Sequence, residues 1–164
     1  MRIIVVSDTH GDTQFRQVLD AYQADAIFHA GDSELDYEAK VMQGMYRIRG
    51  NNDRDVRYET ELSVTLGGKT IFITHGHLYD IYNGLQRLDY RAQEVDADIV
   101  LFGHTHQLGA EKVGDILYLN PGSFTRPRGG HPATFAILDV RIDGSVKVTY
   151  RTPKGIIVHE VIFK

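Results

Sequence analysis

Short apolar runs alternate with amphipathic segments through the first half of the chain. Residues 3–6 form a continuous β-branched run, which is typical of a strand buried on both faces. The apolar positions from Phe15 to Tyr22 then follow the spacing of one helical stripe. Asp12 or Thr13 is placed to cap this helix. The same reasoning predicts strands over 26–28 and 46–48 and a further helix over 35–42. Strands that alternate with helices in this way indicate a parallel sheet.

The second half contains more strands. Residues 63–66 and 70–74 flank Gly67-Gly68, a pattern that predicts a hairpin. The apolar positions from Leu85 to Val95 predict another helix. Further strands are expected over 99–102, 116–119, 134–140, 146–150 and 156–163, with a turn at Asp143-Gly144. We find no linker, repeat or low-complexity tract. We therefore expect a single domain over residues 1–164, with two packed sheets and helices outside them.

Composition narrows the class of protein. The chain has 164 residues, a formal net charge of −4, no cysteine and eight histidines. Disulfides and thiolate metal sites are excluded, so any metal must use imidazole, carboxylate or amide ligands. The net charge disfavours nucleic acid as a partner. The apolar runs are far shorter than the ~20 residues that span a bilayer, so we expect no membrane association and a cytoplasmic protein.

Polar side chains gather directly after the ends of the predicted strands. The clusters are Asp8-Thr9-His10, His29 with Asp32, Asn51-Asn52-Asp53, His75-Gly76-His77 and His104-Thr105-His106. Ligands of open α/β sheets bind outside the carboxyl ends of strands, so five such clusters predict one shared site. A lone histidine at a strand end is more often a hydrogen-bonded structural residue, and we assign His29 that role. Together the residue types suit Mn²⁺, Fe²⁺, Zn²⁺, Ni²⁺ or Co²⁺.

These motifs carry a family resemblance. The order Asp8-x-His10, Gly31-Asp32, Gly50-Asn51-x-Asp53, His75-Gly76-His77 and Gly103-His104-x-His106 resembles the calcineurin-like metallophosphoesterases. Asn120-Pro121-Gly122-Ser123 is similar to their small branch of YfcE-type phosphodiesterases and Vps29-like proteins. The resemblance implies an α/β fold, a single-domain four-layer α/β/β/α sandwich of two mixed sheets flanked by helices. It also implies hydrolysis of a small phosphodiester or another phosphate ester.

The resemblance further implies a dinuclear metal site. Asp8, His10 and His106 would hold one divalent ion, Asn51, His75 and His104 the other, and Asp32 would bridge them. Two such ions, Mn²⁺ being the leading candidate, outweigh the charges of the two carboxylates and leave the centre positive enough to hold a phosphate. A hydroxide between the ions would be the nucleophile, because bound metals lower the pKa of water toward neutrality.

One position departs from the wider superfamily. Many members have a histidine after the metal-binding asparagine, where this chain has Asn52. An amide has no useful proton to give at pH 7, so we expect slow turnover of substrates with poor leaving groups. We name Asn52 and His77 as catalytic candidates, and His77 has a structural role as its alternative.

Several alternatives stay open at this point. A Vps29-like binding scaffold or a phosphomonoesterase would fit the same fold, although a scaffold has no need of the complete ligand set. The chain is also compatible with a homodimer. Arg126 and Arg128 either contact a substrate phosphate or belong to a solvated loop.

Overall fold

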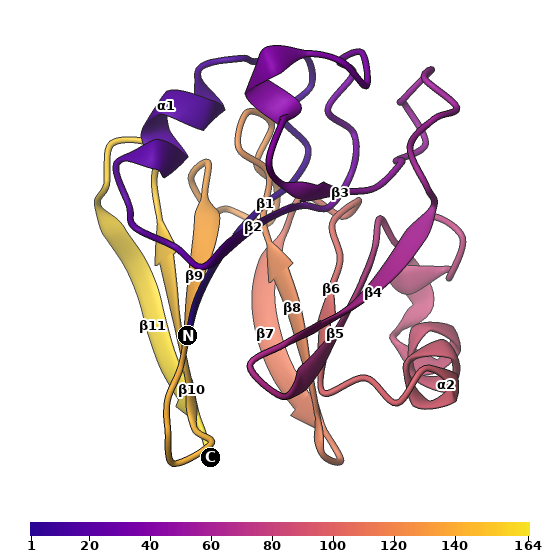
Figure 1. Cartoon of the computed structure of the whole chain (residues 1–164), viewed down its shortest axis with the longest axis vertical. Coiled ribbons are helices and arrows are strands. Elements are labelled where there is room, and N and C mark those ends of the chain that lie inside the picture. Colours follow the sequence, from indigo (N-terminus) through magenta and orange to yellow (C-terminus); the bar gives the residue numbers. More distant parts are fainter.

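Two mixed β-sheets pack face to face, with one α-helix on the outer side of each (Figure 1). The structure is a computed structural model that describes all of residues 1–164. The six-stranded sheet has the order β11 (Ile157–Phe163), β10 (Val146–Arg151), β9 (Phe135–Val140), β1 (Arg2–Val6), β2 (Ala26–His29) and β3 (Tyr46–Arg47). The five-stranded sheet has the order β4 (Glu61–Leu66), β5 (Lys69–Thr74), β6 (Ile99–Leu101), β8 (Ile116–Pro121) and β7 (Leu108–Val113). The helices are α1 (Phe15–Asp20), α2 (Gln86–Glu94) and the short 3₁₀ turns η1 (Lys40–Met42) and η2 (Ile81–Asn83).

Strand β1 shows why the sheets form four layers. Its side chains alternate, so Ile3 and Val5 enter the core between the sheets while Ile4 and Val6 join the cluster beneath α1. All four are fully buried, as the β-branched run predicts. On the other sheet, α2 buries Leu88 in a separate cluster. The predicted α/β/β/α sandwich is confirmed, although each outer layer holds a single short α-helix. Neither α1 nor α2 has the length and apolar character needed to cross a membrane.

The helix predicted over residues 35–42 is wrong. Only η1 is helical there. The backbone N–H of Glu34 donates to the Asp53 carboxylate at 2.7 Å, and that of Tyr37 donates to the Asp55 carboxylate at 2.8 Å. These bonds tie the start of the segment to a distant loop. The chain then turns tightly, with the Ala39 N–H donating to the Asp36 carbonyl at 2.9 Å, an i−3 bond in place of the i−4 bonds of an α-helix.

The strand β7 was missed by the sequence analysis. It lies at the edge of its sheet, and most of its side chains are exposed. An edge strand with one partner and little burial has no strong apolar alternation to reveal it. The predicted hairpin is confirmed as β4 and β5, with both Gly67 and Gly68 at positive φ as a tight turn requires.

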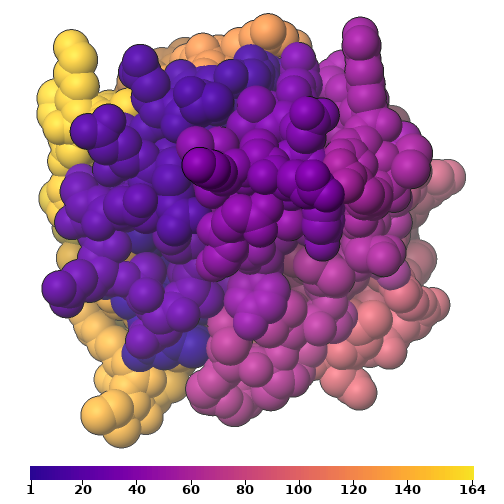
Figure 2. Space-filling model, turned by 45° about the horizontal axis from the view of Figure 1, so that its top comes forward, coloured from indigo at the N-terminus to yellow at the C-terminus, as the bar shows by residue number.

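Parallel pairing brings the ends of the strands together. β1 pairs in parallel with β2, and β2 with β3. In the second sheet β5 pairs in parallel with β6, and β6 with β8. The carboxyl ends of these strands lie toward the top of Figure 1. With that end turned partly toward the viewer, much of the surface comes from the first half of the chain, in indigo to magenta, and orange atoms lie along its upper edge (Figure 2).

Candidate metal centre

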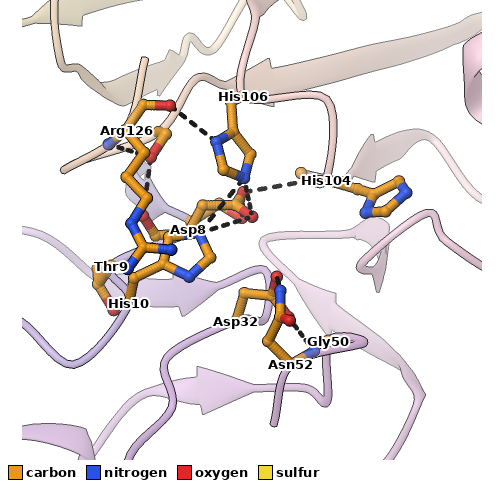
Figure 3. Close-up of polar contacts among 12 residues, drawn as sticks. Asp8, Thr9, His10, Asp32, Gly50, Asn52, His104, His106 and Arg126 are labelled. Atoms are coloured by element: carbon orange, nitrogen blue, oxygen red, sulfur yellow. Dashed lines mark hydrogen bonds and ion pairs between the residues drawn. The ribbon is translucent and has the colours of Figure 1, made fainter. Parts of the chain in front are cut away.

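The loops after five strands bring the candidate ligands toward one place, as the strand-end motifs predict (Figure 3). Asp8 and His10 follow β1, Asp32 follows β2, Asn51 follows β3, His75 follows β5, and His104 and His106 follow β6. These loops come from both sheets. The Nδ1 atom of His75 lies 2.7 Å from the Ala30 carbonyl oxygen and so joins the two sheets directly.

The buried carboxylate of Asp8 lies at the centre of the candidate ligands. Asp8 is fully buried, and its Oδ2 accepts hydrogen bonds from the Ser7 hydroxyl at 2.6 Å and the His104 N–H at 3.2 Å. Its Oδ1 has no hydrogen-bond partner. Three imidazole Nε2 atoms surround this Oδ1, at 3.1 Å for His106, 3.8 Å for His75 and 3.9 Å for His10. An unsatisfied carboxylate oxygen at this depth is costly unless a cation compensates it.

The outer nitrogen of each imidazole has its own partner. Nδ1 of His106 donates to the Arg126 carbonyl at 2.7 Å, and Nδ1 of His75 donates to the Ala30 carbonyl. Nδ1 of His10 lies 2.6 Å from the Glu34 carboxylate. Carbonyl oxygens only accept, so in the neutral rings of His106 and His75 the Nε2 atom carries the lone pair. Hydrogen bonds to the second ring nitrogen orient metal-binding histidines in proteins, and here they turn Nε2 toward the Asp8 carboxylate.

Two groups of ligand atoms share Asp8. The first is Asp8, His10 and His106, and the second is Asp8, Asp32 and His75; within each group the ligand atoms lie within 4.8 Å of one another. Nε2 of His75 lies 3.4 Å from Asp32 Oδ2 and 3.1 Å from Asn51 Oδ1, so Asn51 joins the second group. In both groups, lone-pair atoms face one another across short gaps. The donor set therefore fits divalent cations bound on both sides of Asp8.

The charges of the centre favour a cation. Burial alone would lower the pKa of His75, but its contact with Asp32 and the charge of Asp8 raise it above the ordinary value. Burial alone would raise the pKa of Asp32, but its contacts with His75 and Asn52 hold it well below the ordinary value. The carboxylates thus stay charged, and they attract positive charge to the space beside them.

Three predicted site residues have side chains that belong to neither group of ligand atoms. The His104 backbone contacts Asp8, but its ring lies beside His75, with 5.1 Å between centroids, and its nitrogens are outside both groups. The Asn52 side chain donates to Asp32 Oδ2 at 2.6 Å, so its amide is turned toward a candidate ligand. His77 lies 5.4 Å from the His75 ring, and its buried Nδ1 has no partner.

Backbone strain is concentrated at the candidate ligands. Asp8, His10, Asp32, His104 and His106 all adopt positive φ, between 45° and 69°. Such conformations cost a non-glycine residue on the order of 1–3 kcal/mol and persist where the surrounding structure imposes them. Their occurrence at five of the predicted ligands indicates that the loops are shaped for a site.

Two glycines allow the loops to approach closely. A Cβ atom at Gly50 would lie 2.0 Å from Asp32 Oδ1, and one at Gly103 would lie 2.0 Å from the Ser7 hydroxyl and 2.7 Å from Asp8 Oδ2. Neither position has room for a side chain. The sequence analysis placed these glycines beside the ligands, and the structure gives the reason.

Asp53 supports the site in a way that the sequence analysis missed. Its buried carboxylate accepts hydrogen bonds from the N–H groups of Asp32, Gly50 and Glu34, at 2.7–2.8 Å, and from the Ser33 hydroxyl at 3.2 Å. It therefore holds the loop after β2 against the loop after β3. The signal available was its place in the Gly50-Asn51-Asn52-Asp53 motif, which does not reveal what the carboxylate touches.

Asn120 and Ser123 support the other side of the centre. The Asn120 amide donates to the Gly103 carbonyl at 2.9 Å, and the Ser123 hydroxyl donates to the Asp8 carbonyl at 2.8 Å. The Asn-Pro-Gly-Ser turn thus ties β8 to the loops after β1 and β6. This explains its position in the sequence without giving it a part in the chemistry.

His29 is a buried structural residue, as expected. Its ring lies behind the site, where Nδ1 accepts from the Gly31 N–H at 3.2 Å and Nε2 lies 3.0 Å from the Thr9 hydroxyl. Complete burial lowers the pKa of the His29 imidazole from 6.5 to about 4. The folded protein therefore keeps this ring neutral at pH values where the unfolded chain protonates it.

This difference predicts a pH-dependent loss of stability. The contribution of His29 is fully present above pH 6.5 and is lost as the pH falls toward about 4, because only the unfolded state takes up the proton. Between pH 7 and pH 5 the wild type should lose about 2 kcal/mol more unfolding free energy than His29→Gln. Urea unfolding of both metal-free proteins at the two pH values measures this difference. Equal losses in the two proteins would show that His29 is not the responsible group.

Comparison with known proteins identifies the class. Residues 1–143 match the family model of the calcineurin-like phosphoesterase superfamily domain. The probable metallophosphoesterase YsnB of Bacillus subtilis is 34% identical over 148 residues, which cover 88% of each protein. The phosphodiesterase YfcE of Escherichia coli K12 is 41% identical over 108 residues, covering 61% of this chain and 55% of YfcE. The chain belongs to the calcineurin-like phosphoesterase superfamily, and this membership supports a metal-dependent phosphoesterase as its class.

Two solved structures agree with the fold. A conserved protein of Streptococcus pneumoniae TIGR4, described as a predicted phosphoesterase, is 40% identical and superimposes with a TM-score of 0.94 over 99% of this chain and 96% of that one. Vps29 of Entamoeba histolytica in complex with Zn²⁺ superimposes with a TM-score of 0.81 over the whole of both chains, at 21% identity. The second likeness shows the fold alone. The predicted family resemblance is confirmed.

Proposed function

We propose that this protein is a phosphodiesterase that uses two divalent metal ions. The observation that carries the proposal is the buried, unpartnered Oδ1 of Asp8 among three imidazole Nε2 atoms at the ends of parallel strands. Hydrogen bonding within the protein leaves that oxygen unsatisfied, whereas a cation beside it would satisfy its lone pair and those of the facing imidazoles. Family membership supports phosphate esters as the substrates.

The residues around Asp8 would divide between two ions. Asp8, His10 and His106 would hold the first, and Asn51, His75 and His104 would hold the second, with Asp32 between them. The place of His104 in this set rests on its motif, because its ring nitrogens lie outside both groups. When bound, two divalent ions lower the pKa of a water molecule and stabilise the leaving oxygen.

The other side chains would orient the ligands. Glu34, Ala30 and Arg126 hold the three Nδ1 atoms, so the Nε2 atoms face inward. Asn52 holds Asp32 through its side-chain amide and its backbone N–H. Since that amide is engaged with Asp32, we propose that Asn52 positions a ligand and gives the leaving group no proton. Aryl leaving groups, which need no proton, are therefore expected to react fastest.

Hydrolysis of a small aryl ester tests the proposal. The protein is stripped with a chelator, reloaded with Mn²⁺, and assayed on bis(4-nitrophenyl) phosphate and on 4-nitrophenyl phosphate. We expect release of nitrophenolate from the diester only after reloading, with a higher kcat/KM for the diester than for the monoester. A reversed preference would indicate a phosphomonoesterase. Absence of turnover with two bound Mn²⁺ ions would favour a binding scaffold.

A further inference from the structure

The loop of residues 125–130 carries two arginines that have no acidic partner. Arg126 and Arg128 are exposed, and neither forms an ion pair. Arg2, Arg16, Arg57 and Arg91 have carboxylate partners, whereas the exposed Arg54, Arg87 and Arg141 have none. Arg126 and Arg128 differ from these three because they stand two residues apart on one loop. In an acidic protein, two unpaired guanidinium groups on one short loop form a local positive patch.

This loop is fastened to the candidate metal centre. The Arg126 carbonyl accepts from Nδ1 of His106 at 2.7 Å, and the Arg128 N–H donates to the His106 carbonyl at 3.0 Å. The Thr125 hydroxyl donates to the Asp8 carbonyl at 3.2 Å. Both arginines are therefore held at a defined place beside two candidate ligands, although their side chains are exposed.

Tyr82 links the Arg128 side chain to the backbone of His104. Nη1 of Arg128 donates to the Tyr82 hydroxyl at 3.2 Å, and that hydroxyl donates to the His104 carbonyl at 3.3 Å. The Tyr82 ring lies 5.2 Å from the His104 ring. Tyr82 belongs to η2 beside the second sheet, so the Arg128 side chain bridges from the loop after β8 to η2 across His104. An uncompensated guanidinium beside the candidate metal centre is suited to an anion, which it can contact with two N–H groups.

The far side of the centre has the opposite charge. A cavity of about 750 Å³ is lined by Asn51, Asn52, Glu34, Asp36, Asp53, Asp55, Leu35 and Arg54. In Figure 3, Arg126 and Asn52 lie on either side of Asp8. An anionic group of a substrate would be repelled from the acidic cavity and attracted to the arginine loop. The opposite charges on the two sides of the centre therefore favour one orientation of a bound substrate, with its anionic group toward the arginine loop.

We propose that Arg126 and Arg128, with Tyr82 as the positioning residue of Arg128, bind a second anionic group of the substrate. The substrate class is then a phosphodiester that carries a further phosphate or carboxylate on one arm, and the opposite arm faces the acidic cavity. This inference rests on the proposed phosphodiesterase function and narrows its substrate. It assigns the two arginines to substrate recognition, which the sequence alone left open.

A matched pair of substrates tests the second subsite. Thymidine 3′-(4-nitrophenyl phosphate) and the same compound with a 5′-phosphate differ only in the second anionic group. With the Mn²⁺-loaded protein we expect kcat/KM to be about tenfold or more higher for the 5′-phosphorylated ester, the size of a charge-assisted contact. In the double variant Arg126→Gln, Arg128→Gln the ratio should fall to about one. In Tyr82→Phe, which keeps the ring and removes the hydroxyl, the ratio should fall part of the way.

The control and a binding measurement separate the two proposals. Arg141→Gln removes an exposed arginine from the turn between β9 and β10 and should keep the wild-type ratio. A wild-type ratio near one, or a ratio that the double variant does not change, overturns the second subsite while phosphodiesterase activity stands. If neither ester is hydrolysed, the proposed function fails. The Kd values of thymidine 3′,5′-bisphosphate and thymidine 3′-phosphate, measured by calorimetry on wild type and double variant, then decide the subsite alone, and equal values overturn it.

Discussion

Replacing Asp8 by asparagine should lower kcat/KM for an aryl phosphodiester by about 10³-fold or more without unfolding the protein. The carboxylate oxygen that has no partner lies among the Nε2 atoms of His106, His75 and His10. An amide nitrogen in its place would donate a hydrogen bond to Nε2 of His106, and it would repel a cation. The other oxygen can keep its contacts with Ser7 and His104.

The metal-free and metal-loaded protein should respond differently. In metal-free protein, Asp8→Asn should melt within a few degrees of the wild type, because the substitution removes both the burial cost of the charge and its attraction to His106 and His75. In the presence of Mn²⁺ at 100 times its Kd, the wild type should gain about 5–10 °C and the variant should gain little.

Differential scanning calorimetry with and without Mn²⁺, together with the nitrophenolate assay, measures these effects. Asp139→Asn is the matched control, since it changes a carboxylate of the same type that pairs with Arg2 on the surface. Full metal-induced stabilisation of Asp8→Asn would contradict the assignment of Asp8 as a metal ligand.

Asp53→Asn should lower the unfolding free energy by about 3 kcal/mol and the activity by about 10–100-fold. Each oxygen of this buried carboxylate accepts two hydrogen bonds. An asparagine must place its NH₂ group against one of these pairs of donors. Of the two, the Ser33 hydroxyl can turn and accept, but the Glu34 N–H on the same side would lose its partner. The loop after β2, which carries Asp32, would therefore lose part of its support.

Urea unfolding and the diester assay measure both effects in the same preparation. Asp36→Asn is the control, because Asp36 lines the same cavity, is exposed, and makes no side-chain hydrogen bond that we observe. If Asp53→Asn and Asp36→Asn had the same small effect, the carboxylate of Asp53 would not support the loop as described.

The predictable parts of the fold are those in which local pattern and tertiary burial agree. Strand β1 is evident in the sequence because it is buried on both faces, and α2 is evident because its buried Leu88 and Ala92 lie on one helical face. The segment from 35 to 42 has apolar side chains at helical spacing as well. Only η1 is helical there, because the N–H groups of Glu34 and Tyr37 tie the start of the segment to Asp53 and Asp55, which lie 18–19 residues away, and the chain turns at Asp36–Ala39. No local pattern contains that contact.

The candidate site was likewise predictable only in part. Placement of ligand-type side chains at strand ends could be read from the sequence, because parallel strands end at one edge of a sheet. Ring orientation could not, since it depends on contacts between distant segments. The His75 ring is oriented by the Ala30 carbonyl, 45 residues away, and the His10 ring by Glu34, 24 residues away. For the same reason the position of the His104 ring and the engagement of Asn52 with Asp32 became visible only in the structure.

The sequence by itself determined which side chains are available at the strand ends, that thiolate ligands are absent, and that the chain resembles a metallophosphoesterase. Only the tertiary structure decided which atoms face one another. It placed the Asp8 Oδ1 atom among three Nε2 atoms and Asp53 beneath the loops, and it set the arginines of the 125–130 loop beside His106. The physical reason is that the orientation of a lone pair, the tautomer of an imidazole and the pairing of a charge all depend on neighbouring groups. Folding brings these groups together from distant parts of the sequence.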